Sequence, residues 1–211
     1  MRSWIFAGVL ALGLFAMTAP ASAGVMLLVR HDVSDYSTWR KAYDGFRGTQ
    51  RKLGVTKQSV YQSVDNPNDV TVLHGFKSEA AAKSFLASEK LKAAMQGGGV
   101  KGAPQILITE TTAGATGHPG KVRLFVRHEV ADYAAWRKGY DGFAPTLHKA
   151  GVSAQGVLQT AGSPNDVVVY HDFATSEAAK SFVASPDLKT AMQSAGVKGQ
   201  PQIWITTLAT K

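Results

Sequence analysis

The 211-residue chain contains no cysteine. This absence excludes disulfides, zinc–thiolate sites, iron–sulfur clusters and cysteine nucleophiles, because each of them requires a thiol. A dense basic run is also missing, although 23 lysines and arginines against 15 acidic residues give a formal net charge of +8. Because the positive charge is dispersed, we expect no nucleic-acid partner.

Long hydrophobic runs are scarce, and the one present is at the N-terminus. Arg2 precedes an almost uninterrupted apolar run from Trp4 to Met17, and the small residues Ala21-Ser22-Ala23 follow. This order is typical of a secretory signal peptide cleaved before Gly24. The run is shorter than the roughly 20 residues of a transmembrane helix, so we expect no membrane span in the mature chain. We predict a signal peptide over residues 1–23 and a periplasmic or secreted location.

The rest of the chain is an internal duplication of one sequence unit. At a constant offset of 97 residues, 50 of the 85 positions in Val25–Thr109 are identical in Val122–Thr206, without a gap. Residues 112–120 lie between the copies and are rich in Gly, Ala and Thr, which predicts a flexible linker. The sequence therefore predicts two small domains, residues 24–111 and 121–211.

Each unit has the periodicity of a β-α-β-β-α-β order. Val25–Val33 is apolar on both alternating faces, which predicts a strand that is covered on both sides. Aromatic residues at helical spacing then follow Asp35, a suitable N-cap, and predict a helix that ends at Gly54. Two short strands over 56–63 and 70–76, a helical region after Ser78 and a last strand over 105–111 complete the unit.

This order predicts an α+β fold of two tandem ferredoxin-like domains, each with both helices on one face of a four-stranded antiparallel sheet. The other face would expose an apolar patch too large for a soluble monomer. The second copy supplies a sheet that can cover it. We therefore predict that the two sheets close face to face into an intramolecular pseudo-dimeric α/β barrel, and we leave open whether chains associate further as homo-oligomers.

The repeated motifs resemble those of the dimeric α/β-barrel superfamily, which includes antibiotic-biosynthesis-type monooxygenases, haem-degrading monooxygenases and stress-associated proteins. The resemblance covers the whole mature chain as two fused copies and identifies a fold better than a reaction. It implies a small, often aromatic or hydrophobic ligand between sheet and helices. The motifs are Val29-Arg30-His31, Asp35-Tyr36 with Trp39-Arg40-Lys41, Pro67-Asn68-Asp69-Val70, and Ala82-Lys83-Ser84-Phe85 with Ala87-Ser88.

The haem-degrading members imply an asparagine on the first strand and a histidine iron ligand on the second helix. The first strands contain no asparagine, and residues 78–96 and 175–193 contain no histidine. We therefore expect no haem, and the sequence assigns no other cofactor.

Four of the six histidines are duplicated, His31 with His128 after the first strand and His74 with His171 near the end of the third. If the strand register brings His31 and His74 together, a paired imidazole site could bind a divalent metal or move a proton near neutral pH. Otherwise each is a half-buried residue that is hydrogen-bonded to the backbone or to a carboxylate, for which Asp32, Asp44 and Asp172 are candidates. The four histidines are the candidate catalytic residues. No metal site is assigned, because two histidines lack a third ligand.

Candidate ligand-binding residues come from the first helix and first strand of each copy. The helical stripe has the spacing of a core face and the chemistry of a pocket wall for an aromatic guest. Arg30 and Arg127 lie on the opposite side of the strand from the neighbouring histidine. They are either buried, and then paired or holding an anion, or solvated at a strand end, which we favour. The stripe consists of Tyr36, Trp39, Tyr43, Tyr133, Trp136 and Tyr140.

The sequence thus predicts an exported barrel protein that binds a small hydrophobic or aromatic molecule, with cofactor-independent monooxygenase-like activity as its enzymatic form. The alternatives are a non-catalytic binding or stress-response module, and metal binding through the histidine pairs. Differences between the copies suggest that one copy holds a pocket which the other has filled. These differences are Leu73 and Tyr170, Gly75 and Asp172, and Leu107 and Trp204.

Overall fold

The computed structural model describes residues 24–209. Its first half contains β1 (Val25–Val33), α1 (Tyr36–Lys52), β2 (Lys57–Ser63), β3 (Asp69–Phe76), α2 (Glu79–Leu86), α3 (Glu89–Gly97) and β4 (Val100–Gly117). The second half contains β5 (Val122–Val130), α4 (Tyr133–Gly142), α5 (Ala144–Lys149), β6 (Ala154–Thr160), β7 (Ser163–Phe173), α6 (Ser176–Val183), α7 (Pro186–Ser194) and β8 (Val197–Leu208).

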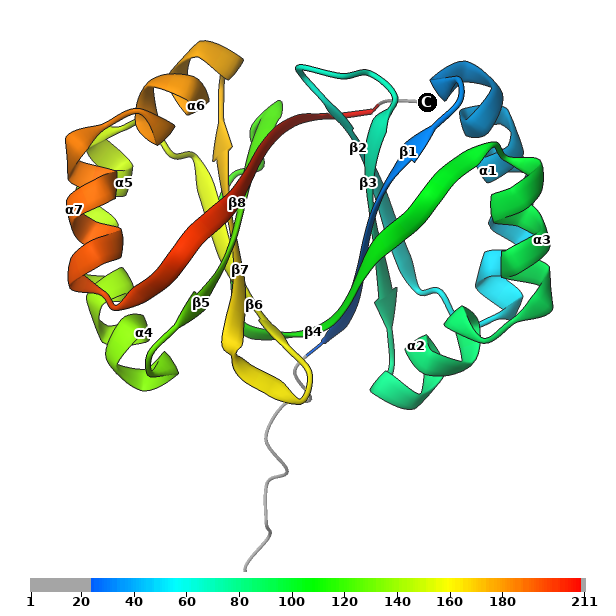
Figure 1. Ribbon diagram of the computed structural model, residues 1–211, viewed down its shortest axis with the longest axis horizontal. Coiled ribbons are helices and arrows are strands. Elements are labelled where there is room, and N and C mark those ends of the chain that lie inside the picture. Colours follow the sequence, from blue (N-terminus) through cyan, green and yellow to red (C-terminus); the bar gives the residue numbers. More distant parts are fainter. Residues whose placement is uncertain (1–23, 210–211) are drawn as a thin grey trace, which may run out of the picture.

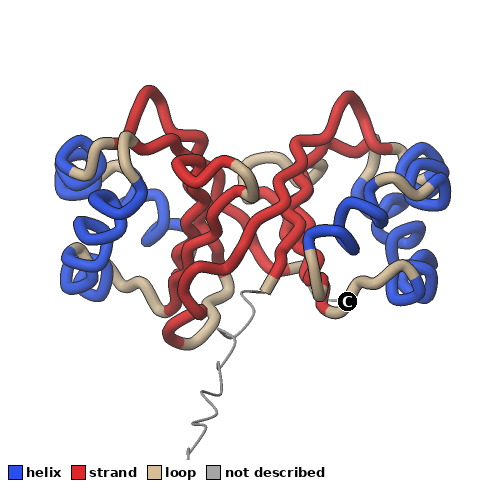
Figure 2. The backbone as a smooth tube through the Cα atoms, turned by 90° about the horizontal axis from the view of Figure 1, so that it is seen from below, coloured by secondary structure: helices blue, strands red, loops and turns tan. Residues whose placement is uncertain are grey.

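The strands form one closed antiparallel barrel with the helices outside it on two opposite sides (Figures 1 and 2). The order around the barrel is β1-β3-β2-β8-β5-β7-β6-β4. Each half contributes four adjacent strands in the ferredoxin-like order, β4-β1-β3-β2 and β8-β5-β7-β6. The predicted α+β fold of two tandem units that share one barrel is therefore confirmed.

The last strand of each half joins the two halves. β4 pairs with β1 and, beyond Thr109, with β6, where Thr111 lies opposite Leu158 and Gly117 opposite Ala154. β8 likewise pairs with β5 and with the end of β2. The prediction of a flexible linker over residues 112–120 is therefore wrong as far as Gly117, because this backbone hydrogen-bonds in a ladder with β6 that its composition does not reveal. The predicted domain boundaries themselves stay a prediction.

The local signals for the first helix act as expected in both halves. The Asp35 carboxylate accepts a hydrogen bond from the Thr38 N–H at 2.7 Å, and the chain leaves α1 through Gly54 at φ +97°. In the second half this helix is divided into α4 and α5. Pro145, which replaces Gly48, stands in the first turn of α5, where its missing N–H would interrupt a continuous helix.

The two faces of the sheet bury different cores. Along β1, Val25, Leu27 and Val29 pack beneath the helices of the first half. Leu28 points the other way, into the barrel, where side chains from both halves form a common core. That interior core contains Leu28, Tyr61, Leu73, Leu107, Phe125, Leu158, Val168, Tyr170 and Trp204.

The predicted signal peptide, residues 1–23, lies outside the described residues, so it and the predicted location stay predictions. Within residues 24–209, no helix has the length and apolar character needed to cross a membrane.

Candidate functional site

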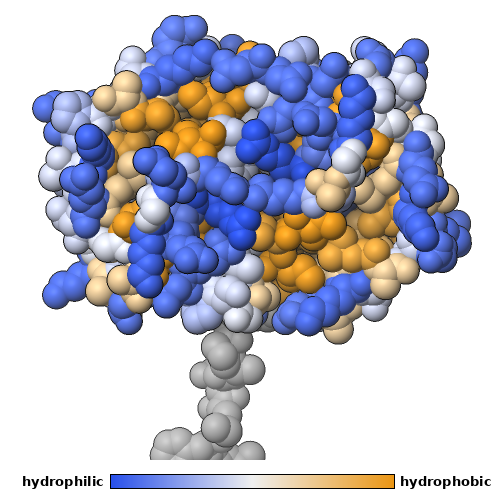
Figure 3. Space-filling model, viewed as in Figure 1, coloured by the Kyte–Doolittle hydropathy of each residue, from blue (hydrophilic) through white to orange (hydrophobic). Residues whose placement is uncertain are grey.

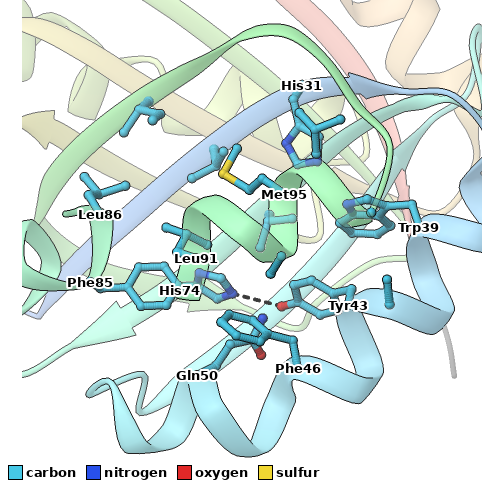
Figure 4. Close-up of a pocket in the computed structure, with 17 residues that line it drawn as sticks. His31, Trp39, Tyr43, Phe46, Gln50, His74, Phe85, Leu86, Leu91 and Met95 are labelled. Carbon is cyan, nitrogen blue, oxygen red and sulfur yellow. Dashed lines mark hydrogen bonds between the residues drawn. The ribbon is translucent and has the colours of Figure 1, made fainter. Parts of the chain in front are cut away.

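A cavity of about 60 Å³ lies between the sheet and the helices of the first half (Figure 4). His31 on β1 and His74 on β3 belong to its sheet wall, and Trp39 and Tyr43 on α1 belong to its helix wall. Leu91 and Met95 of α3 also line it, and the exposed Ile106 of β4 stands at its border. Figure 3 shows hydrophobic side chains at the surface on this side of the molecule, beside the hydrophilic centre of the face.

The second half contains an equivalent cavity of about 50 Å³. Every residue that lines it is the counterpart, 97 positions later, of a residue that lines the first cavity. His128, Trp136, Tyr140 and His171 thus repeat the four aromatic groups named above. The chain therefore carries two copies of one pocket, one on each side of the barrel.

The histidines of one half do not pair with each other. His31 lies opposite Val70, and His74 lies opposite Leu27, four residues away along β1, which corresponds to roughly 13 Å along the sheet. Figure 4 shows the two imidazoles on different sides of the pocket. The paired-imidazole arrangement that we considered is therefore wrong, and the register, which is invisible in the sequence, is the reason.

His31 is buried against Trp39, with 5.6 Å between ring centroids. Neither of its ring nitrogens has a hydrogen-bond partner among the described residues, and the same holds for His128, which packs on Trp136. Burial lowers the pKa of both imidazoles to about 4, although nearby carboxylates oppose the shift. Each ring is therefore neutral at pH 7, with one donor and one acceptor nitrogen unused.

His74 and His171 each have one partner. The His74 Nε2 atom lies 2.9 Å from the Tyr43 hydroxyl, and the His171 Nε2 atom lies 3.0 Å from the Tyr140 hydroxyl. Burial lowers the pKa of His74 to about 4 and that of His171 to about 3. Burial also raises the pKa of both tyrosines. Both side chains of each Tyr–His hydrogen bond are therefore neutral at pH 7.

The alternative prediction, that each of the four histidines is hydrogen-bonded to the backbone or to a carboxylate, is also wrong. Two rings are hydrogen-bonded to tyrosine and two are not hydrogen-bonded within residues 24–209. Asp44 is bonded to Arg40, and Asp172 to Arg123 on the barrel side of the sheet. Asp32 is exposed, and its carboxylate accepts only a long hydrogen bond from Asn66 at 3.5 Å.

The predicted aromatic stripe divides into two groups. Trp39 and Tyr43 line the first cavity and stack on each other with ring centroids 5.0 Å apart, as Trp136 and Tyr140 do in the second. Tyr36 and Tyr133 instead pack against the outer side of these tryptophans. Tyr133 also donates a hydrogen bond to the Thr112 hydroxyl.

Arg30 and Arg127 are held in ion pairs. The prediction that they are solvated at a strand end is therefore wrong. Arg30 makes a bidentate ion pair with Asp69, with distances of 3.0 and 2.6 Å, and its guanidinium lies 4.8 Å from the centre of the Trp204 ring. Arg127 pairs with Asp166 in the same way. Both arginines point to the barrel side of the sheet, which separates them from the histidine pockets.

The differences between the copies that we singled out lie inside the barrel. Trp204 donates a hydrogen bond from Nε1 to the Thr71 hydroxyl at 3.0 Å, and Arg123 forms a bidentate ion pair with the buried Asp172 beneath the Tyr170 ring. They fill the shared core and leave both helix–sheet cavities present. The idea that one copy has filled the pocket of the other is therefore wrong.

Sequence reasoning missed the buried Gln50, which also lines the first cavity. The available signal is a polar residue on the apolar face of a helix, at a position where the other copy has Leu147.

The pocket residues do not fit haem. The cavities are far smaller than a porphyrin, their histidines lie on strands, and α2, α3, α6 and α7 contain no histidine. Within the described part of the chain, no cluster of three or more histidine or acidic side chains is arranged to hold a metal ion.

Neither a protein-family model nor a curated protein matches the sequence. Solved structures do resemble the fold. An anthrone oxidase-like protein has a TM-score of 0.66 at 14% identity over 89% of this chain and 92% of its own. A ferredoxin-fold protein from Listeria monocytogenes related to antibiotic biosynthesis monooxygenases has 0.55 at 8% identity over 90% and 97%. A heme-binding protein from Thermus thermophilus has 0.59 at 12% identity over 89% and 92%. At these identities the likeness shows the fold alone, a barrel of two ferredoxin-like units.

Proposed function

Because the chain has the dimeric α/β-barrel fold with two equivalent pockets, we propose that it binds a small aromatic molecule carrying a hydroxyl or carbonyl group. The observation that carries this proposal is the state of His31 and His128. Each imidazole is buried at a cavity wall with both nitrogens unpartnered by the described residues. Leaving such a group without a partner costs about 1–3 kcal/mol, which a hydrogen-bonding ligand would recover.

The size and lining of the pockets restrict the ligand. A cavity needs roughly 10–15 Å³ to hold one water molecule. The first cavity, of about 60 Å³, therefore has room for roughly four to six water-sized groups, which is about the size of a single aromatic ring. The stacked Trp39 and Tyr43 provide flat apolar surface for that ring. A neutral imidazole suits an uncharged polar substituent, because it offers one donor and one acceptor.

An enzymatic form of this function is the second candidate, and the monooxygenase and oxidase relationships named for the structural neighbours favour it. In such a reaction dioxygen oxidises a phenol to a quinone: one oxygen atom replaces the hydrogen of a ring carbon and becomes a carbonyl, and the other oxygen leaves as water with that hydrogen and the phenolic hydrogen. His31 and His128 are the candidate bases for this reaction. A phenol of pKa about 10 and an imidazole of pKa about 4 differ by about six units, equivalent to about 8 kcal/mol. Full proton transfer therefore requires a more acidic substrate, and we place binding before catalysis.

Calorimetric titration with phenol and benzene tests the binding proposal. The double variant His31→Phe, His128→Phe keeps a ring but removes the polar nitrogens, so we expect it to lose phenol affinity at least tenfold and to keep benzene affinity. His148→Gln, at an exposed position, is the matched control. Unchanged phenol binding in the double variant would overturn the role of the histidines. Binding of neither compound to the wild type would leave the non-catalytic module, in which these residues only support the core.

The catalytic and location parts have separate tests. Oxygen consumption with hydroxylated aromatic compounds should stop in the variant His31→Ala, His128→Ala if these residues are the bases, and unchanged turnover would refute that role. We also propose that the protein is exported. Mass spectrometry of the periplasmic or secreted fraction should then find a chain that begins at Gly24, and a chain retained in the cytoplasm with residues 1–23 would contradict export.

A further inference from the structure

The two pockets have equivalent lining positions but differ in one residue at the end opposite His31 in the first pocket and His128 in the second. Gln50 lines this end in the first pocket, and Leu147 occupies the equivalent place in the second. Each is 2% exposed. Figure 4 shows Gln50 and His31 on opposite sides of the first cavity. The first pocket thus has the carboxamide of Gln50 at the end opposite His31, whereas the second pocket has the apolar side chain of Leu147 at this place.

A second glutamine holds Gln50 in place. With its carboxamide oriented to satisfy its neighbours, Gln58 donates hydrogen bonds to the Gln50 carbonyl oxygen at 2.7 Å and to the Tyr43 hydroxyl at 3.2 Å. The Gln58 oxygen accepts from the Arg47 guanidinium, with Nη2 at 2.8 Å. The second half keeps the hydrogen bond between Tyr140 and Gln155 at 3.0 Å. It has Ala144 and Leu147 in place of Arg47 and Gln50, so the links from Arg47 through Gln58 to Gln50 have no counterpart there.

Gln50 retains hydrogen-bonding capacity after these contacts. A carboxamide offers two N–H donors and two acceptor lone pairs. Gln58 occupies one acceptor position, and the nearby Tyr43 hydroxyl can satisfy at most one donor. Leucine fills the same space in the second half at no polar cost, so packing does not explain a buried glutamine here. The remaining donor and acceptor can serve a group inside the cavity.

We propose that the first pocket selects a single-ring aromatic ligand with uncharged polar groups at two opposite positions, one bonded to His31 and the other to Gln50, and that the second pocket does not make this selection. This inference rests on the proposed binding function and adds to it the substrate class and the residue that determines specificity. Hydroquinone represents the class, and phenol represents the ligand with one polar end.

The two histidines provide a separate reporter for each pocket. We suggest titrating the purified protein with phenol or hydroquinone under nitrogen, while NMR follows the assigned ring C–H signals of His31 and His128. One additional neutral hydrogen bond contributes about 0.5–1.5 kcal/mol, equivalent to about two- to twelvefold in affinity. We therefore expect hydroquinone to bind the His31 pocket about two- to twelvefold more tightly than phenol, and the His128 pocket to show no such preference.

A reciprocal pair of substitutions tests the role of Gln50. Gln50→Leu introduces the residue that the second copy already has at this place, and it should remove the preference for hydroquinone at His31 while phenol binding stays. Leu147→Gln should create part of that preference at His128. If Leu147→Gln does not fold, Gln50→Leu decides alone.

Each outcome of this experiment has one meaning. Equal preference of the two wild-type pockets, or a preference that survives Gln50→Leu, overturns this inference and leaves the proposed binding function standing. No shift of either histidine signal with any compound overturns the proposed function itself.

Discussion

The four duplicated histidines should make the fold acid-labile at a pH where carboxylates have little influence. Burial lowers the pKa of His31, His74 and His128 from 6.5 to about 4, and that of His171 to about 3. In the unfolded chain these rings become protonated below pH 6.5, whereas in the folded chain they remain neutral until about pH 4. The unfolded state therefore binds more protons, and stability falls as the pH decreases from 6.5 towards 4.

The expected loss is large compared with the stability of a typical domain. At pH 5, a histidine with a pKa of 4 when folded and 6.5 when unfolded lowers the free energy of unfolding by about 2 kcal/mol. Four such residues together give about 8 kcal/mol, against a total stability of about 5–15 kcal/mol for most proteins. The fold should therefore lose most of its stability near pH 5, with a slope approaching about 5 kcal/mol per pH unit.

Urea unfolding followed by tryptophan fluorescence between pH 7.5 and 5 measures this loss. The double variant His31→Phe, His128→Phe should have about half the slope, because two of the four groups no longer titrate. It should also be at least as stable as the wild type at pH 7, because it no longer buries unpartnered nitrogens. His148→Gln should reproduce the wild-type curve. A fall of less than about 2 kcal/mol between pH 7 and pH 5 would refute the reasoning.

The barrel interior provides two further predictions, each with a control taken from the first copy. Arg123→Met leaves the carboxylate of Asp172, which is 1% exposed, without its partner, and should cost about 3–5 kcal/mol in urea unfolding. Adding Asp172→Gly, which completes the Met26/Gly75 pair of the first copy, should recover most of this loss; no recovery would argue against the ion pair as the cause. Gly156→Ser places a Cβ about 2.4 Å from the Tyr170 ring and should cost about 1–3 kcal/mol in the same assay. Tyr170→Leu, the residue of the first copy, should relieve this clash, and equal costs with and without Tyr170 would contradict it.

The fold could be predicted because its signals are local or repeated. The alternation of Val25–Val33 and the change to helical spacing after Asp35 define the elements, and the second copy explains what covers the apolar face of the sheet. Strand pairing carries less information in the sequence. Residues 112–117 have the composition of a linker, yet they form strand because β6 offers free hydrogen-bonding groups beside them.

The candidate site was only partly predictable for the same reason. Period-two alternation places His31 and Arg30 on opposite faces of the sheet, but it does not show which face the helices cover. It also does not show that His74 lies four residues further along the sheet. The pairing of Arg30 with Asp69 joins residues 39 positions apart, and only the register of β1 with β3 brings them together. Gln50 was overlooked because helical periodicity identifies a buried face without showing that a cavity opens there.

The fusion of two copies into one chain has freed the barrel interior from symmetry. In a dimer of identical subunits every substitution near the axis occurs twice, so a tryptophan introduced there must fit against its own twin. Here Trp204 has Leu107 as its counterpart, and the Thr71 that accepts its hydrogen bond has Val168 as its own. A single mutation could therefore be accommodated by a single compensating mutation across the interface. The same freedom lets equivalent positions of the two pockets carry different residues, as Gln50 and Leu147 do.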